Sequence, residues 1–143
     1  MKFLQHTYSI LLALLIFCGC VSSQEIAPKE VQTAFKKKYP GENDPDWHKD
    51  SNGNFESHFK IKGKSLRADF SPDGQWIETE RSIKKDELPK AVRNTIEKEY
   101  KALKIAEIEE VDHHSKGRFY DIEFKRKGEN KDVEINENGM IIN

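Results

Sequence analysis

The sequence predicts an α+β fold made of two tandem αβββ(β) repeats, which form one antiparallel sheet with two helices packed on one face. Two helical segments, residues 26–39 and 88–100, match each other at a constant offset, and the strand-like segments that follow them also match. Each set of strands ends in a hairpin signal, Asp-Gly at 73–74 and Asn-Gly at 138–139. Such pairs between alternating strands favour tight turns, because both residues tolerate positive φ.

Each helical segment is amphipathic. Apolar residues recur at i, i+3 and i+4 spacing, which is the period of a helix with one buried side. They are Val31, Ala34, Phe35 and Tyr39 in the first segment, and Leu88, Val92, Ile96 and Tyr100 in the second. Pro28 and Pro89 are expected at the first helical position, where a missing N–H has no partner to lose.

The turns also predict which strand residues share a face. We expect two-residue turns at 63–64 and 128–129 in addition to the two hairpins above. They pair Phe59 with Ala68 and Phe70 with Ile77 in the first repeat, and Phe124 with Val133, Ile122 with Ile135 and Ile135 with Ile142 in the second. All these apolar residues then lie on one face, and a slip of one residue would invert every side chain. We therefore expect both helices on that face.

The opposite, open face is predicted to carry the partner-binding residues. Aromatic anchors in a polar surround are typical of protein interfaces. An alternative is that a strand bend or a loop covers these anchors. Charged neighbours are expected to pair across strands, His58 with Asp69 and Arg67 with Glu80. The candidate residues are Trp76, Phe119, His58, Arg67, Asp69 and Ile141.

Trp47 has two alternative positions. A two-residue turn at 52–53 would put it beside His58 on the open face. A three-residue turn would put it in the core.

Residues 1–23 have the layout of a secretory signal peptide. Lys2 precedes an unbroken apolar run at 10–17, and small residues follow. Cleavage after residue 23 would leave Gln24 first, whereas a degenerate lipobox at 17–20 would leave a lipidated Cys20. We expect export to the periplasm or cell envelope, with a lipid at Cys20 as the one link to the membrane. The remaining domain, 24–143, holds repeats 26–81 and 86–143.

Composition and motifs exclude several functions. The 24 Lys and Arg residues balance 25 Asp and Glu residues, so the chain has no electrostatic footprint for nucleic acid. Both cysteines fall in the export segment, which leaves none for disulfides. No catalytic triad order or phosphate loop is present. Adjacent His113 and His114 would point to opposite faces of a strand, so no metal site is expected. We expect no cofactor, no catalytic residue and a monomer.

Several motifs together resemble one family. The helix from Ala27-Pro28-Lys29 to Tyr39-Pro40, the strand with Trp47 and the hairpin 69–76 are similar to the β-lactamase-inhibitor-like, PepSY-like proteins exported by Bacteroidetes. The likeness spans about 26–142. It implies one PepSY-like domain of tandem units in one sheet, and a binding or inhibitory module that uses the open sheet face. The chain differs from the secreted inhibitors in its shorter units and its lack of disulfides.

Two functional hypotheses follow. The first is a non-enzymatic exported protein that binds an envelope protein or peptide through the open face. The alternative is an envelope sensor of a small ligand or metal that uses the histidines and carboxylates of the same face.

Overall fold

The computed structural model describes residues 26–43 and 45–143 and has two α-helices, a short 3₁₀ helix and seven β-strands. The elements are α1 (Lys29–Lys38), β1 (Asp46–Lys49), β2 (Phe55–Ile61), β3 (Lys64–Phe70), β4 (Trp76–Ser82), η1 (Lys85–Glu87), α2 (Lys90–Glu99), β5 (Lys104–His113), β6 (Gly117–Lys125) and β7 (Lys131–Asn136). The strands form one antiparallel sheet in the order β1 to β7. The predicted α+β class with a single antiparallel sheet is therefore confirmed.

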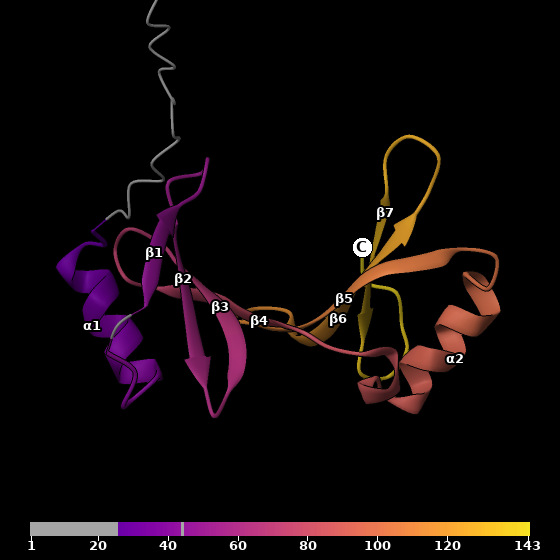
Figure 1. The fold of residues 1–143 in the computed structure, drawn as a ribbon, viewed down its shortest axis with the longest axis horizontal. Helices are drawn as coiled ribbons and strands as arrows, with labels where there is room; N and C mark the ends of the chain where they lie inside the picture. Colours follow the sequence, from indigo (N-terminus) through magenta and orange to yellow (C-terminus); the bar gives the residue numbers. More distant parts are fainter. Residues whose placement is uncertain (1–25, 44) are drawn as a thin grey trace, which may run out of the picture.

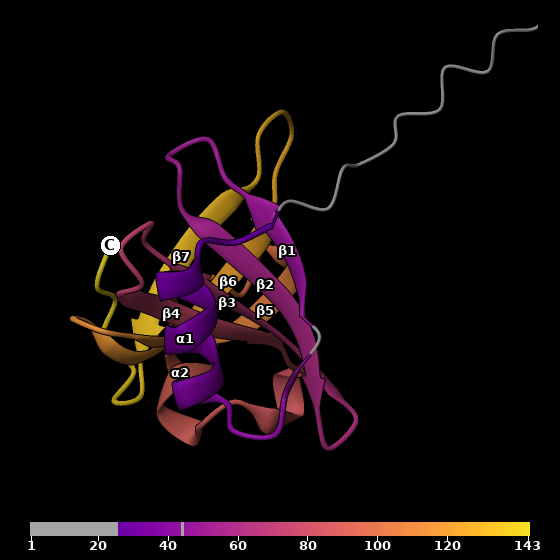
Figure 2. The ribbon, with the colours of Figure 1, turned by 90° about the vertical axis from the view of Figure 1, so that its left-hand side faces the viewer.

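The sheet is strongly curved, and the two helices lie at its opposite ends on the outer side of the curve (Figure 1). From the side, α1 lies across the strands of the first half of the sheet (Figure 2). The predicted signal peptide, with Cys20 and Gln24, lies outside the described residues.

Both helices begin directly after a proline. The backbone at Pro28 and Pro89 is extended, with ψ 156° and 149°, and each proline carbonyl accepts the first helical N–H, from Gln32 and Arg93 at 3.0 Å. The prolines thus cap the helices and do not occupy the first helical position. Proline suits this place because its fixed φ leads into the helix and it has no N–H to leave unpaired.

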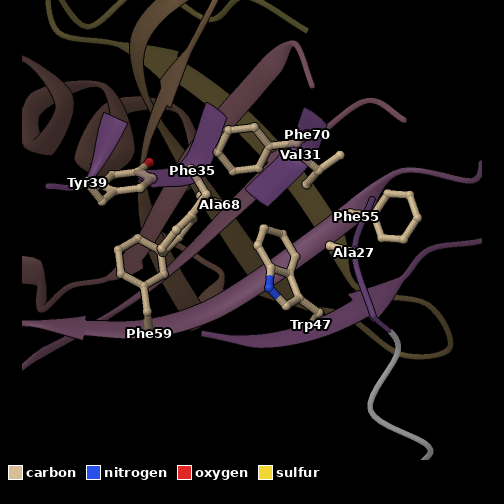
Figure 3. Close-up of a cluster of buried hydrophobic side chains, with 9 residues drawn as sticks. All are labelled: Ala27, Val31, Phe35, Tyr39, Trp47, Phe55, Phe59, Ala68 and Phe70. Carbon is tan, nitrogen blue, oxygen red and sulfur yellow. The ribbon is translucent and has the colours of Figure 1, made fainter. Parts of the chain in front are cut away.

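The first half of the core is aromatic and surrounds Phe35 of α1 (Figure 3). Its ring centroid lies 5.0 Å from Phe59, 5.1 Å from Tyr39 and 5.5 Å from Trp47, mostly in tilted or edge-on geometry. Such pairs are worth about 0.5–1.5 kcal/mol beyond the apolar area that they bury. Trp47 is therefore a core residue. The three-residue turn is correct, since the N–H of Asp50 donates to the carbonyl of Asn54.

The second half of the core is mainly aliphatic. Val92 and Ile96 of α2 are buried against Ile122 of β6 and Ile135 of β7. Tyr100 stacks on Phe124 with a centroid distance of 4.8 Å. By strand alternation these residues share the sheet face that contacts α1, so both helices pack on one face as predicted.

The two Gly-containing hairpins touch the helices. A Cβ on Gly74 would lie 2.8 Å from the carbonyl oxygen of Glu30, and one on Gly139 would lie 2.8 Å from that of Ala91. Thr95 also donates its hydroxyl to the Gly139 carbonyl at 2.6 Å. Both glycines have φ of +83°. Glycine is required here for the left-handed backbone and for the close approach of a helix.

Two predicted turns have a different position. The β2–β3 turn is Lys62-Gly63, both with positive φ, as a type I′ turn requires. The β6–β7 connection is longer than two residues, because β6 ends at Lys125 and β7 begins at Lys131, and Phe124 pairs with Lys131 and not with Val133. The true partners of Phe59 and Ile122 are Leu66 and Val133. Each shift is two residues, so the pairings were wrong but the predicted faces are preserved.

Both Gly-containing hairpins have a three-residue loop, and the first also has a β-bulge. The N–H of Ser71 donates to the Gln75 carbonyl, which closes a three-residue loop, and Phe70 pairs with Trp76 instead of Ile77. In the second half Ile135 pairs with Ile141 instead of Ile142. The extra residue in the loop turns Trp76 and Ile141 toward the helix side of the sheet, because directly opposite residues share a face.

Candidate functional site

The open face is defined here as the face of the sheet opposite the two helices. One row of directly paired residues crosses it over all seven strands: Asp46, His58, Arg67, Glu80, Val111, Phe119 and Asn136. A second row holds His48, Glu56, Asp69, Glu78 and His113, and a third holds Ser82, Glu109, Asp121 and Glu134. The face lies on the inner side of the curved sheet in Figure 1.

Four of the six predicted binding residues lie on this face: His58, Arg67, Asp69 and Phe119. His58 is directly opposite Arg67, and not opposite Asp69 as predicted, because of the corrected β2–β3 turn. Asp69 lies one row away, between Glu56 and Glu78. The predicted pair of Arg67 with Glu80 is present, with a 2.6 Å ion pair.

Trp76 was predicted on the open face, and this placement is wrong. The hairpin bulge directs its indole toward α1, where it packs on the first half of the core. The indole N–H donates to the carbonyl of Glu78 at 2.8 Å, and the ammonium of Lys38 lies 3.3 Å from the ring centroid. Trp76 is thus a structural residue, half-buried under the end of the first helix.

Ile141 was misplaced for the same reason. It pairs with Ile135, a core residue, and therefore lies on the helix side at the edge of the sheet. Its side chain remains 39% exposed.

Phe119 lies on the predicted face but is not an exposed anchor. It is 3% exposed, and its pair Val111 is 1% exposed. The Lys116 ammonium lies 5.1 Å from the Phe119 ring and forms a 2.6 Å ion pair with Glu134. The alternative that a strand bend or a loop covers this residue is therefore correct, because Lys116 of the β5–β6 turn lies over its ring.

A groove of about 540 Å³ lies at the Arg67 end of the open face. Its walls include His58, Arg67, Glu80 and Glu109. The guanidinium of Arg67 donates to both Glu80 and Glu109, at 2.6 and 2.5 Å. These carboxylates hold Arg67 in one orientation and leave little of its charge free to attract an anion.

Three carboxylates of the face, Asp69, Glu109 and Glu78, have raised pKa values. Burial, followed by repulsion from Glu56 and Glu78, raises the pKa of Asp69 to about 7. Burial raises the pKa of Glu109 to about 7, with Arg67 opposing the shift. Burial and then Glu80 also raise the pKa of Glu78. The face is therefore an acidic surface whose charge changes near neutral pH.

The pKa of Asp121 is raised too, by burial and then by Asp132 and Glu134. Its Oδ1 atom is buried and has no hydrogen-bond partner among the described residues. A buried carboxylate oxygen without a donor is unfavourable, so Asp121 adds to the unsatisfied negative character of the face.

The helix side between the two helices has a different character. Arg81 makes a two-bond contact with Glu110 at 3.0 and 3.1 Å, and Arg118 makes one with Asp112 at 2.9 and 3.1 Å. Glu110 and Asp112 are therefore each paired with an arginine, whereas Asp69, Glu78 and Asp121 of the open face form no ion pair with Lys or Arg in the described part of the chain.

Glu109 and Val111 were missed by the sequence analysis. In strand β5 the apolar residues Ile108 and Val111 are three apart, which does not fit strict alternation. Val111 breaks the pattern because it is buried at the bend of the open face. No local pattern in the sequence indicated that Val111 pairs with Phe119.

Among residues 26–43 and 45–143, no three His, Cys, Asp or Glu side chains are grouped so as to hold a metal ion. No helix within the same described ranges has the length and apolar character needed to cross a membrane.

Comparison with solved structures shows the same fold in several Bacteroides proteins. A DUF2874 family protein from Bacteroides ovatus ATCC 8483 matches with a TM-score of 0.74 and 22% identity, over 83% of this chain and 86% of that one. A protein from Bacteroides eggerthii DSM 20697, described among "putative periplasmic proteins", has a TM-score of 0.72 and 23% identity, over 83% and 88%. A BLIP-like protein from Bacteroides fragilis NCTC 9343 has a TM-score of 0.72 and 17% identity, over 85% and 86%.

No curated protein matches the chain. The family model described as "Putative beta-lactamase-inhibitor-like, PepSY-like" matches residues 54–143, which is more than half of the sequence. That match agrees with the resemblance expected from the helix and hairpin motifs. The chain belongs to the β-lactamase-inhibitor-like, PepSY-like family.

Proposed function

We propose that the chain is a non-enzymatic, inhibitor-like binding protein that engages a protein or peptide partner of the cell envelope through the open face. The observation that supports this proposal is that one face of the sheet is uncovered. Neither helix covers the inner side of the curve, and a groove of about 540 Å³ opens on it. A seven-stranded surface of this kind is wide enough for a polypeptide partner.

The family and the fold support a binding role. The family description is inhibitor-like, and one structural neighbour is described as BLIP-like. Fold alone does not specify a target, so the partner must be recognised by the residues of this particular face.

The proposed location is the periplasm or the cell envelope. The first 23 residues support export, and a neighbour of the same fold is described as periplasmic. The mass of the mature N-terminus separates a chain that begins at Gln24 from one lipidated at Cys20.

Steric blocking of the face tests the proposal. Both cysteines lie at positions 18 and 20, so a chain that starts at Gln24 contains none, and an introduced cysteine is unique. His58→Cys on the open face and Glu97→Cys on α2 replace accessible side chains, 44% and 64% exposed. Each variant is coupled to a polyethylene glycol chain and used to capture partners from an envelope extract.

We expect the modified His58→Cys protein to lose the captured partner, whereas the modified Glu97→Cys protein retains it. Equal capture by both modified proteins would rule out the open face as the binding surface. Unmodified variants control for the substitutions themselves.

A further inference from the structure

The central rows of the open face, from β3 to β7, have a strong excess of carboxylates. The acids in these rows are Asp69, Glu78, Glu80, Glu109, Asp121 and Glu134. Arg67 is the one Lys or Arg side chain that the strands place among them. Lys116 reaches the same region from the β5–β6 turn. The whole chain is nearly neutral, so this excess is a local property of the face.

The two cations in this region, Arg67 and Lys116, already form ion pairs, whereas three of the acids form none among the described residues. Arg67 contacts Glu80 and Glu109, and Lys116 contacts Glu134. Within the described part of the chain, Asp69, Glu78 and Asp121 form no ion pair with Lys or Arg. The ionised form of a half-buried carboxylate beside other carboxylates is less stable than the same form in water. An external cation would relieve the repulsion between these carboxylates.

The dimensions of the face fit an extended polypeptide. Seven strands at a spacing of roughly 4.8 Å give a width of about 29 Å, which an extended chain of about nine residues can cross at roughly 3.3 Å per residue. Alternate side chains of such a segment point the same way. Four or five of them, roughly, would therefore face the sheet.

We propose that the open face receives an extended segment of its partner that carries lysine or arginine at alternate positions, with the cations directed at the unpaired acids Asp69, Glu78 and Asp121. This inference rests on the proposed function and names the chemistry of the partner. It distinguishes the open face from the helix side, where Glu110 and Asp112 already have arginine partners.

A proton should be released on binding. A cation beside Asp69 favours its ionised form, and this carboxyl is partly protonated near neutral pH. Binding should therefore strengthen between pH 6 and pH 8. A purely surface-charge interaction with fully ionised acids would show no such dependence.

The probes are two ten-residue amidated peptides, one of alternating lysine and alanine and one of alternating glutamate and alanine. Their binding to the exported, processed protein is measured by calorimetry at about 0.15 M salt, where weak exposed charge pairs are largely screened. The open-face variant is Asp69→Asn, Glu78→Gln and Asp121→Asn. The matched control, with the same change in net charge, is Glu30→Gln, Glu97→Gln and Glu99→Gln on the exposed sides of the helices.

We expect the lysine peptide to bind and the glutamate peptide not to bind. The open-face variant should weaken lysine-peptide binding at least tenfold, and the control variant less than twofold. Chemical-shift changes in the wild-type protein should fall on β3, β4 and β6, which keeps the test valid if a variant folds poorly. Equal losses in both variants, equal binding of both peptides or no binding would overturn the inference.

Failure here is distinguishable from failure of the proposed function. If the lysine peptide does not bind but a polymer at position 58 still blocks partner capture, the face binds a partner of different chemistry. If the polymer has no effect, the proposed function itself is wrong.

Discussion

The contact between each Gly-containing hairpin and a helix gives the sharpest stability prediction. Gly74→Ala forces a side chain into a left-handed backbone at φ +83° and places its Cβ 2.8 Å from the Glu30 carbonyl oxygen. The backbone conformation costs roughly 1–2 kcal/mol. Moving the helix to relieve the overlap costs roughly another 1–3 kcal/mol, as overpacking does in other cores. We expect a total loss of about 2–5 kcal/mol.

Gly63→Ala is the matched control. Gly63 has φ of +78°, but a Cβ there would meet nothing within 4 Å. This variant should lose only the roughly 1–2 kcal/mol of the backbone term. Urea unfolding followed by tryptophan fluorescence gives both values, and the midpoint should shift while the slope stays constant. Equal losses in the two variants would refute the idea that the hairpin is docked tightly on α1.

Three further predictions concern the core and the acidic face. Trp76→Ala should lower the free energy of unfolding, by less than the roughly 3–5 kcal/mol of a fully buried Trp site, because Trp76 is half-buried and packs under α1; no loss in urea unfolding would mean that the ring is free. Tyr39→Phe removes the hydroxyl that bonds Thr79 and should cost about 0.5–1.5 kcal/mol while the aromatic packing remains, and a neutral result would show that the bond contributes nothing. Stability should decrease as pH rises from about 4 to about 7, because the folded chain retains a proton on Asp69 that the unfolded chain releases near its ordinary value of 3.8. Asp69→Asn should reduce this slope in urea titrations at several pH values, and an unchanged slope would contradict the assignment.

The helices, the sheet and the division into two faces could be predicted from the sequence, because helical spacing and strand alternation are local properties. Phe35, Val92 and Ile122 are buried where their periodicity indicated. The predicted turns were wrong by two residues in pairing, but each residue was still assigned to the correct face, since side chains alternate with a period of two.

The errors at the site arose where one residue was added, not two. The bulge in the hairpin moved Trp76 to the opposite face, and an Asp-Gly pair is compatible with both loop lengths. The burial of Phe119 involves Lys116 of the β5–β6 turn, a contact that strand alternation alone does not predict. Glu109 was not among the predicted residues because it belongs to β5, whose alternation is interrupted by Val111.

Photocrosslinking tests the central claim, that the open face contacts the partner, most directly. A photoreactive residue is introduced at Lys60, an exposed position of β2 that borders the groove, and separately at Glu97 on α2. Each protein is irradiated in an envelope extract. A discrete adduct from position 60 and none from position 97 is the predicted result, whereas an adduct from position 97 alone would contradict the account.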